Sequence, residues 1–271
     1  MNKKQLVEQI KAKSSYLCVG LDTDIKKIPK HLLTEENPVL AFNKAIIDAT
    51  KEYCVSYKIN TAFYEPLGAK GWDIMTETVA YIGNEHFIIA DAKRGDIGNT
   101  SEQYAIAFLQ NMNFDAITIA PYMGKDSVEP FLKFDNKWGI VLGLTSNKGA
   151  EDFEMLPSGD QFLYEKVLTK VASWGTPENL MFVIGATQAS QFENIRKLTP
   201  HHFYLVPGVG AQGGSLKEIS NYAMNDDIGL LINVSRGIIY QSSETDFAEK
   251  AAQSAKEYRD EMKHYIENYK K

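Results

Sequence analysis

Short apolar runs alternate with longer amphipathic stretches along most of the chain. The short runs are rich in β-branched and aromatic residues, which is typical of strands buried on both faces of a parallel sheet. They predict eight strands, at residues 16–21, 55–59, 87–90, 116–119, 139–142, 181–184, 203–206 and 229–232.

The stretches between these runs carry apolar residues at helical spacing. They predict helices at residues 38–52, 73–81, 99–110, 126–134, 161–173, 188–198, 215–222 and 245–268, after an amphipathic helix in MNKKQLVEQIKAK. Strands that alternate with helices in this way predict an α/β fold, a (β/α)8 TIM barrel that forms one domain over residues 1–271. An open doubly wound sheet stays as the alternative, because periodicity does not show whether a sheet closes. The longest irregular segment, residues 147–161, is expected to be a surface excursion.

Composition and charge narrow the class of protein. Apolar residues make up 44% of the chain and the formal charge is −6, so we expect a globular protein that is not chiefly a nucleic-acid binder. No apolar run approaches the roughly 20 residues that span a membrane, and the first residues lack the apolar segment of a signal peptide. Cys18 and Cys54 lie in apolar runs without a CxxC pattern. They favour a cytoplasmic protein with two small core thiols.

Polar and charged residues follow the predicted strands repeatedly. In a barrel these positions meet at the carboxyl ends of the strands, where functional residues collect. They comprise Asp22, Lys58, Asn60, Asp91, Lys93, Asp96, Thr145, Ser146, Ser235 and Arg236.

The densest cluster lies in the segment DAKRGDIGNT, residues 91–100. In an extended strand end Asp91 and Lys93 point to the same face, and Asp96 follows on the next turn. Together with Lys58 from the neighbouring strand, they predict four alternating charges at the barrel mouth. The alternatives are an ion-pair network that only joins adjacent strands, or an Asp96 that caps the following helix.

A glycine-rich segment, PGVGAQGGS, begins at Pro207 and leads into a helix. Glycines allow close approach of the backbone to a ligand, and N–H groups at a helix start attract anions. Arg236 follows the last strand and can form a bidentate contact with phosphate oxygens. Together they predict a phosphate site. The five histidines form no metal-binding pattern, and no dinucleotide or P-loop motif is present, so no metal is expected.

These motifs together resemble the orotidine 5′-monophosphate decarboxylase family. DAKRGDIGNT matches its Asp-x-Lys-x-x-Asp-Ile element, and GLD, YKIN, TSNKGAE, PGVGAQGG and SRG match in order over nearly the whole chain. The stretches around strands one, two and five are longer than in short bacterial members, which indicates a longer subgroup.

The resemblance implies a decarboxylase that needs no cofactor and makes uridine 5′-monophosphate from orotidine 5′-monophosphate. Lys93 would protonate C6 of the pyrimidine, held by Asp91 and Asp96, which also press on the substrate carboxylate. Lys58 and Asp22 would hold the ribose hydroxyls. The remaining substrate contacts implied are Asn60, Ile97, Thr100, Ser146, Pro207, Gln212, Ser235 and Arg236. Ser146 would read the pyrimidine, and Gln212 and Arg236 would bind the phosphate.

The resemblance also implies a homodimer, because residues 96–100 complete the partner's site in this family. Two other functions stay open. One is a Mg²⁺-dependent decarboxylase or aldolase of the same superfamily that acts on sugar phosphates. The other is a barrel that binds a nucleotide without catalysis.

Overall fold

The computed structural model describes residues 1–210 and 213–269, with the backbone alone for residues 187–189. Eight parallel strands close into a barrel in the order β1-β10-β9-β8-β5-β4-β3-β2. Leu17 of β1 lies opposite Ile232 of β10, so the first and last strands pair. The predicted (β/α)8 barrel is therefore confirmed, and the open sheet is wrong. The barrel strands are β1 (Leu17–Gly20), β2 (Ser56–Asn60), β3 (Phe87–Arg94), β4 (Ala116–Ile119), β5 (Trp138–Leu144), β8 (Leu180–Ile184), β9 (Phe203–Pro207) and β10 (Leu230–Val234).

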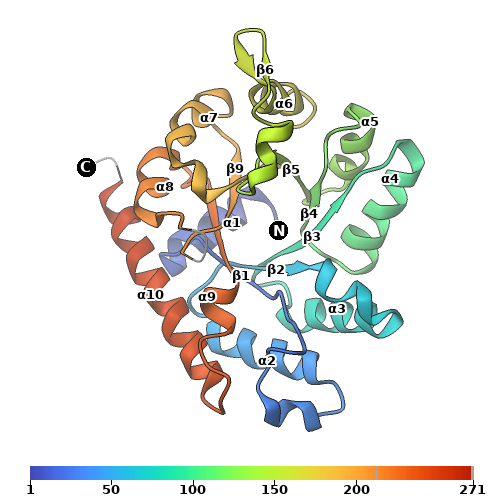
Figure 1. The fold of residues 1–271 in the computed structure, drawn as a ribbon, viewed down its shortest axis with the longest axis vertical. Coiled ribbons are helices and arrows are strands. Elements are labelled where there is room, and N and C mark those ends of the chain that lie inside the picture. The colour runs from blue at the N-terminus through green and yellow to red at the C-terminus, as the bar shows by residue number, and fades with distance from the viewer. Residues whose placement is uncertain (211–212, 270–271) are drawn as a thin grey trace.

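Helices surround the strands on the outside of the barrel, apart from α1 at its amino end (Figure 1). They are α1 (Lys3–Lys13), α2 (Pro38–Thr50), α3 (Ala69–Ile82), α4 (Gly98–Ala105), α5 (Lys125–Val128), α6 (Leu163–Ala172), α7 (Phe192–Leu198), α8 (Leu216–Ala223), α9 (Arg236–Ile239) and α10 (Phe247–Asn268). Short 3-10 helices occupy Lys30–Thr34, Thr61–Phe63, Glu65–Leu67, Glu129–Lys133, Lys148–Asp152 and Ala186–Gln191. In the described part of the chain, no helix is long and apolar enough to cross a membrane.

Three predicted helices change type along their length. The helix expected at 99–110 continues beyond α4 as a π-helical turn, Ile106–Asn111. The helix expected at 126–134 becomes a 3-10 helix after Val128, where Pro130 lacks a backbone N–H and restricts the residue before it. The helix expected at 188–198 is a 3-10 helix as far as Gln191.

The segment after β5 contains a hairpin that the sequence analysis missed. Strands β6 (Pro157–Ser158) and β7 (Gln161–Phe162) pair antiparallel, so α6 begins at Leu163 rather than at residue 161. Gly159 sits between them with φ +72°, a conformation that glycine adopts readily in tight hairpins. The Ser-Gly-Asp sequence at this point was the available signal.

Helix α1 lies against the amino ends of the strands. The Trp138 indole, in the first residue of β5, donates to the Met1 carbonyl at 2.9 Å, and Leu6, Val7 and Ile10 are buried. Figure 1 places α1 behind the centre of the barrel. Helix α1 therefore covers the amino ends of the strands. The polar residues of the predicted site gather at the opposite end, where the strands have their carboxyl ends.

Candidate active site

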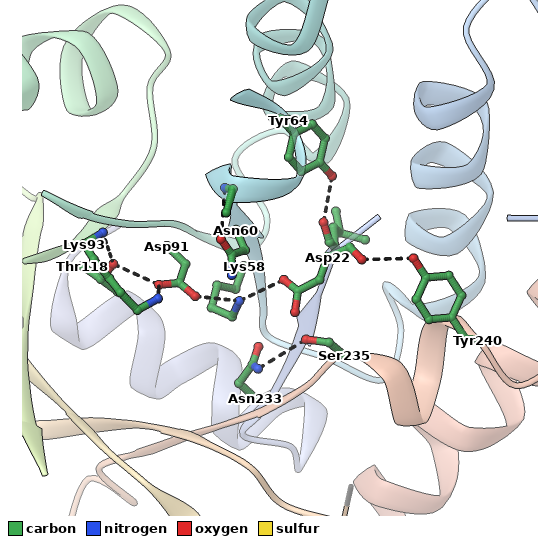
Figure 2. Close-up of polar contacts among 12 residues, drawn as sticks. Asp22, Lys58, Asn60, Tyr64, Asp91, Lys93, Thr118, Asn233, Ser235 and Tyr240 are labelled. Atoms are coloured by element: carbon green, nitrogen blue, oxygen red, sulfur yellow. Dashed lines mark hydrogen bonds and ion pairs between the residues drawn. The ribbon is translucent and has the colours of Figure 1, made fainter. Parts of the chain in front are cut away.

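A buried lysine joins two carboxylates from different strands at the carboxyl end of the barrel (Figure 2). Lys58 Nζ on β2 lies 3.1 Å from Asp22 Oδ1, just after β1, and 3.0 Å from Asp91 Oδ2 on β3. Only 4% of the Lys58 side chain is exposed. The pairing offsets the cost of burying each charge.

The charges in this cluster support each other's ionised state. Burial by itself lowers the pKa of Lys58, but the carboxylates of Asp22 and Asp91 outweigh burial and raise it above its usual range. Burial raises the pKa of Asp91, but Lys58 and Lys93 outweigh it and hold it well below its usual range. Asp91 therefore stabilises the fold at neutral pH, and this contribution is lost only as the pH falls from about 4 through the lowered pKa.

Lys93 completes the cluster from an unusual backbone conformation. Its Nζ lies 2.6 Å from Asp91 Oδ1, and half of its side chain is exposed. The expectation that these two side chains meet is confirmed. Strand β3 continues through Lys93 to Arg94, but the expected extended conformation is wrong at Lys93, which has φ +47° where the pairing of β3 with β4 shifts register. The ammonium group of Lys93 is thus held against a carboxylate while half of the side chain stays exposed.

Asp96 does not join this cluster. Its carboxylate accepts from the N–H of Ile97 at 2.7 Å, and no hydrogen bond or ion pair to Lys93 occurs among the described residues. It does not cap α4 either, since the residue before that helix is Ile97 and no side chain caps it. The fourth charged residue of the cluster is instead Asp22, which pairs with Lys58. Ile97 is 55% exposed and Thr100 is exposed, so the turn points outward.

A cavity of about 200 Å³ adjoins the charged cluster. It links the carboxyl ends of β1, β2 and β3 with the loops after β9 and β10. Its lining includes seven of the expected site residues: Asp22, Lys58, Asn60, Asp91, Pro207, Ser235 and Arg236. Gly208 also lines it with φ +100°, which lets the backbone turn into the cavity. The side chain of Arg236 is exposed and has no ion pair within the described residues.

Ser146 is not among the residues that line this cavity. Ser146 follows β5, where its backbone packs so closely on Gly185 that a Cβ at Gly185 would lie 2.6 Å from Ser146 N. Gln212 lies outside the described residues. Among the residues that are described, no group of three or more His, Cys, Asp or Glu side chains could hold a metal ion.

The sequence analysis missed two polar residues of the site, Thr118 and Asn233. The Thr118 hydroxyl donates to Asp91 Oδ1 at 3.1 Å, and Asn233 lines the cavity. Asn233 Nδ2 donates to Ser235 Oγ at 3.4 Å, while its Oδ1 is buried without a partner. A buried acceptor without a donor is rare and needs an explanation, such as a water or a ligand. The sequence held a signal for both residues: Thr118 is a polar residue inside the apolar run 116–119, and Asn233 directly follows the run 229–232.

We compared the sequence and the structure of this chain with those of known proteins. The model of the orotidine 5′-phosphate decarboxylase / HUMPS family matches residues 15–251. The chain belongs to this family. The family name joins two kinds of enzyme, so membership of the family does not by itself decide which reaction this chain catalyses.

The relatives are named for one of the two. The orotidine 5′-phosphate decarboxylase of Parabacteroides distasonis is 58% identical over 270 residues, covering 98% of this chain and 96% of that protein. That of Phocaeicola vulgatus is 56% identical over 266 residues, covering 97% and 98%. The solved structure of Leishmania donovani OMP decarboxylase has a TM-score of 0.83 at 35% identity and covers 97% of this chain and 99% of that one. The Plasmodium berghei orotidine 5′-monophosphate decarboxylase has a TM-score of 0.84 at 25% identity, with 99% of each chain covered.

Proposed function

We propose that this chain, as one barrel domain over residues 1–271, converts orotidine 5′-monophosphate to uridine 5′-monophosphate and carbon dioxide, the last step of de novo pyrimidine synthesis. The observation that carries the proposal is the Lys58–Asp91–Lys93 cluster beside a cavity that ends at Arg236. The relatives named as this decarboxylase support it. We place the reaction in the cytoplasm, because Cys18 and Cys54 are free buried thiols.

The reaction needs a positively charged group next to C6 of the pyrimidine. When the bond from C6 to the carboxylate breaks, carbon dioxide leaves and the electron pair stays on C6, with no adjacent group to delocalise it. The ammonium of Lys93 stabilises this charge and then gives C6 a proton, which leaves a neutral amine that water reprotonates. Asp91 orients the Lys93 ammonium group beforehand through a contact of 2.6 Å. Its own negative charge opposes the substrate carboxylate and favours departure of that group.

The remaining contacts orient the nucleotide. Asp22 and Lys58 bind the ribose hydroxyls, and Asn60, Pro207 and Ser235 line the cavity beside them. Arg236 and the backbone of the glycine-rich loop, with Gln212, bind the phosphate. Ser146 binds the pyrimidine. Binding energy at the distant phosphate orients the ring at Lys93.

We also propose a homodimer with shared sites, in which Asp96, Ile97 and Thr100 complete the partner subunit's site. The outward turn and the 55% exposure of Ile97 support this arrangement, since an apolar side chain between glycines is suited to an interface. Lys93→Ala and Asp96→Ala should each be nearly inactive, yet regain activity when co-expressed. Half of the randomly formed dimers are mixed, and each has one intact site of two, so about a quarter of wild-type activity should return. If mixed dimers form and activity does not return, Asp96 acts within its own subunit.

The test of the activity follows the ultraviolet absorbance of orotidine 5′-monophosphate mixed with purified protein and a chelator. We expect complete conversion to uridine 5′-monophosphate under these conditions. Turnover of a pentulose or hexulose phosphate that depends on Mg²⁺, without turnover of the nucleotide, would instead identify the sugar-phosphate enzyme. Binding of uridine 5′-monophosphate without any turnover would identify a non-catalytic barrel.

A further inference from the structure

Strand β3 has a bulge opposite a single residue of β4, at the position of Asp91 and Lys93. Ala90 pairs with Ile117 and Arg94 pairs with Ile119, so three residues of β3 face only Thr118. These three residues are Asp91, Ala92 and Lys93. A bulge leaves backbone groups without ladder partners and re-aims the side chains next to it.

The side chain of Thr118 supplies the hydrogen bonds that the ladder lacks. The N–H of Lys93 donates to Thr118 Oγ1 at 2.9 Å, and this hydroxyl donates to Asp91 Oδ1 at 3.1 Å (Figure 2). The same carboxylate oxygen accepts from Lys93 Nζ at 2.6 Å. Thr118 is only 1% exposed, so water does not compete for these bonds. One buried hydroxyl therefore contacts both the backbone of Lys93 and the carboxylate that orients its ammonium group.

The backbone held in this way is strained. Lys93 has φ +47°, in the left-handed region that a residue with a Cβ adopts at a cost. Such a conformation persists only where the surroundings hold it in place. Arg94 supplies a second anchor, because its Nη1 donates to the Ala92 carbonyl at 2.8 Å and its guanidinium is paired with Glu65. The bulge is thus fixed on both sides.

We propose that Thr118 is a positioning residue for the reaction, whose hydroxyl holds the bulge so that the Lys93 ammonium group stays against Asp91 and beside the substrate. The proposal rests on the proposed function, in which Lys93 donates the proton. Because Thr118 acts through Lys93 and Asp91, its hydroxyl should matter for the chemical step more than for binding of the nucleotide.

The test compares Thr118→Val, which replaces the hydroxyl by a methyl group of similar size, with Thr118→Ser, which keeps the hydroxyl. Thr50→Val is the matched control, because the Thr50 hydroxyl is equally buried but bonds to the Ile46 carbonyl of α2 and to the Tyr57 hydroxyl of β2. We expect Thr118→Val to lower kcat and the single-turnover rate by about 10- to 100-fold. KM and the Kd for uridine 5′-monophosphate should change by less than about threefold. Thr118→Ser should recover most of the rate, and Thr50→Val should lose stability without loss of rate.

With Thr118→Val, two results would overturn the proposal while wild-type decarboxylation stands. One is a Thr118→Val enzyme with the rate of Thr118→Ser. The other is a Thr118→Val enzyme in which the rate and the nucleotide affinity fall together, as general loosening of the fold would produce. If Thr118→Val does not fold, Thr118→Cys tests the same point, because a thiol is a weak hydrogen-bonding group. A Thr118→Cys enzyme as fast as Thr118→Ser also overturns it. Failure of the wild-type protein to decarboxylate the nucleotide would contradict the proposed function itself.

Discussion

Replacing Lys58 by Met tests the charged cluster most directly. The change removes the ammonium group and keeps an unbranched side chain of similar size. Nζ lies 3.1 Å from Asp22 and 3.0 Å from Asp91, and the side chain is 4% exposed. Without it, Asp22 loses its ion pair and Asp91 keeps only the pair with Lys93, so a partly buried carboxylate is left without a cation. Breaking a buried ion pair by removing one partner costs about 3–5 kcal/mol.

This cost converts to a change in melting temperature. Unfolding entropy of about 2.1 cal/mol/K per residue, over 271 residues, gives roughly 0.6 kcal/mol/K. We therefore expect Tm to fall by about 5–9 °C, measured by circular dichroism at neutral pH and equal protein concentration. Lys51→Met is the matched control, because its ion pair with Asp48 at 2.9 Å is about half exposed. It should lower the free energy of unfolding by less than about 0.5 kcal/mol.

A double variant separates charge from packing. If the loss in Lys58→Met comes from uncompensated charge, adding Asp91→Asn should cost less than the sum of the two single changes. Additive losses would indicate that packing, rather than charge, causes the instability. A Lys58→Met protein as stable as Lys51→Met would refute the argument that a buried ion pair holds this site together.

Three further substitutions test individual roles. Lys93→Ala should reduce steady-state turnover below a tenth, a loss above about 1.4 kcal/mol, with a smaller fall in Tm than Lys58→Met because its side chain is half exposed. A Lys93→Ala enzyme that keeps more activity would mean that another group donates the proton. Arg236→Ala should impair turnover of orotidine 5′-monophosphate far more than turnover of orotidine, because a hydrogen bond to a charged group contributes about 1.5–3 kcal/mol. Equal losses with both substrates would remove Arg236 from the phosphate site. Asn233→Leu should change the stability of the free protein little, since the lost 3.4 Å bond to Ser235 is offset by removal of a buried acceptor without a donor. Calorimetry should show weaker binding of uridine 5′-monophosphate. Unchanged binding would show that the ligand does not supply the missing donor.

Much of this protein follows from local patterns in its sequence. The eight apolar runs match the eight barrel strands, with ends that differ by at most a few residues. They do so because burial on both faces requires a continuous apolar sequence. Parallel strands present their carboxyl ends on one face, so the order of the chain also indicated that Asp22, Lys58 and Asp91 would meet. The contact of Lys93 with Asp91 followed from their spacing of two residues.

The tertiary structure decided the features that depend on neighbouring strands. Closure of the barrel depends on contacts between β1 and β10, which lie more than 200 residues apart. The left-handed backbone of Lys93 depends on the hydroxyl of Thr118, a residue that the sequence analysis placed in a strand without any role in the site. The carboxylate of Asp96 bonds to the N–H of Ile97 and, among the described residues, makes no ion pair with Lys93, although the two are three residues apart. Periodicity reports which face of an element is apolar, whereas register, bulges and the partner of each buried polar atom are determined by residues distant in sequence.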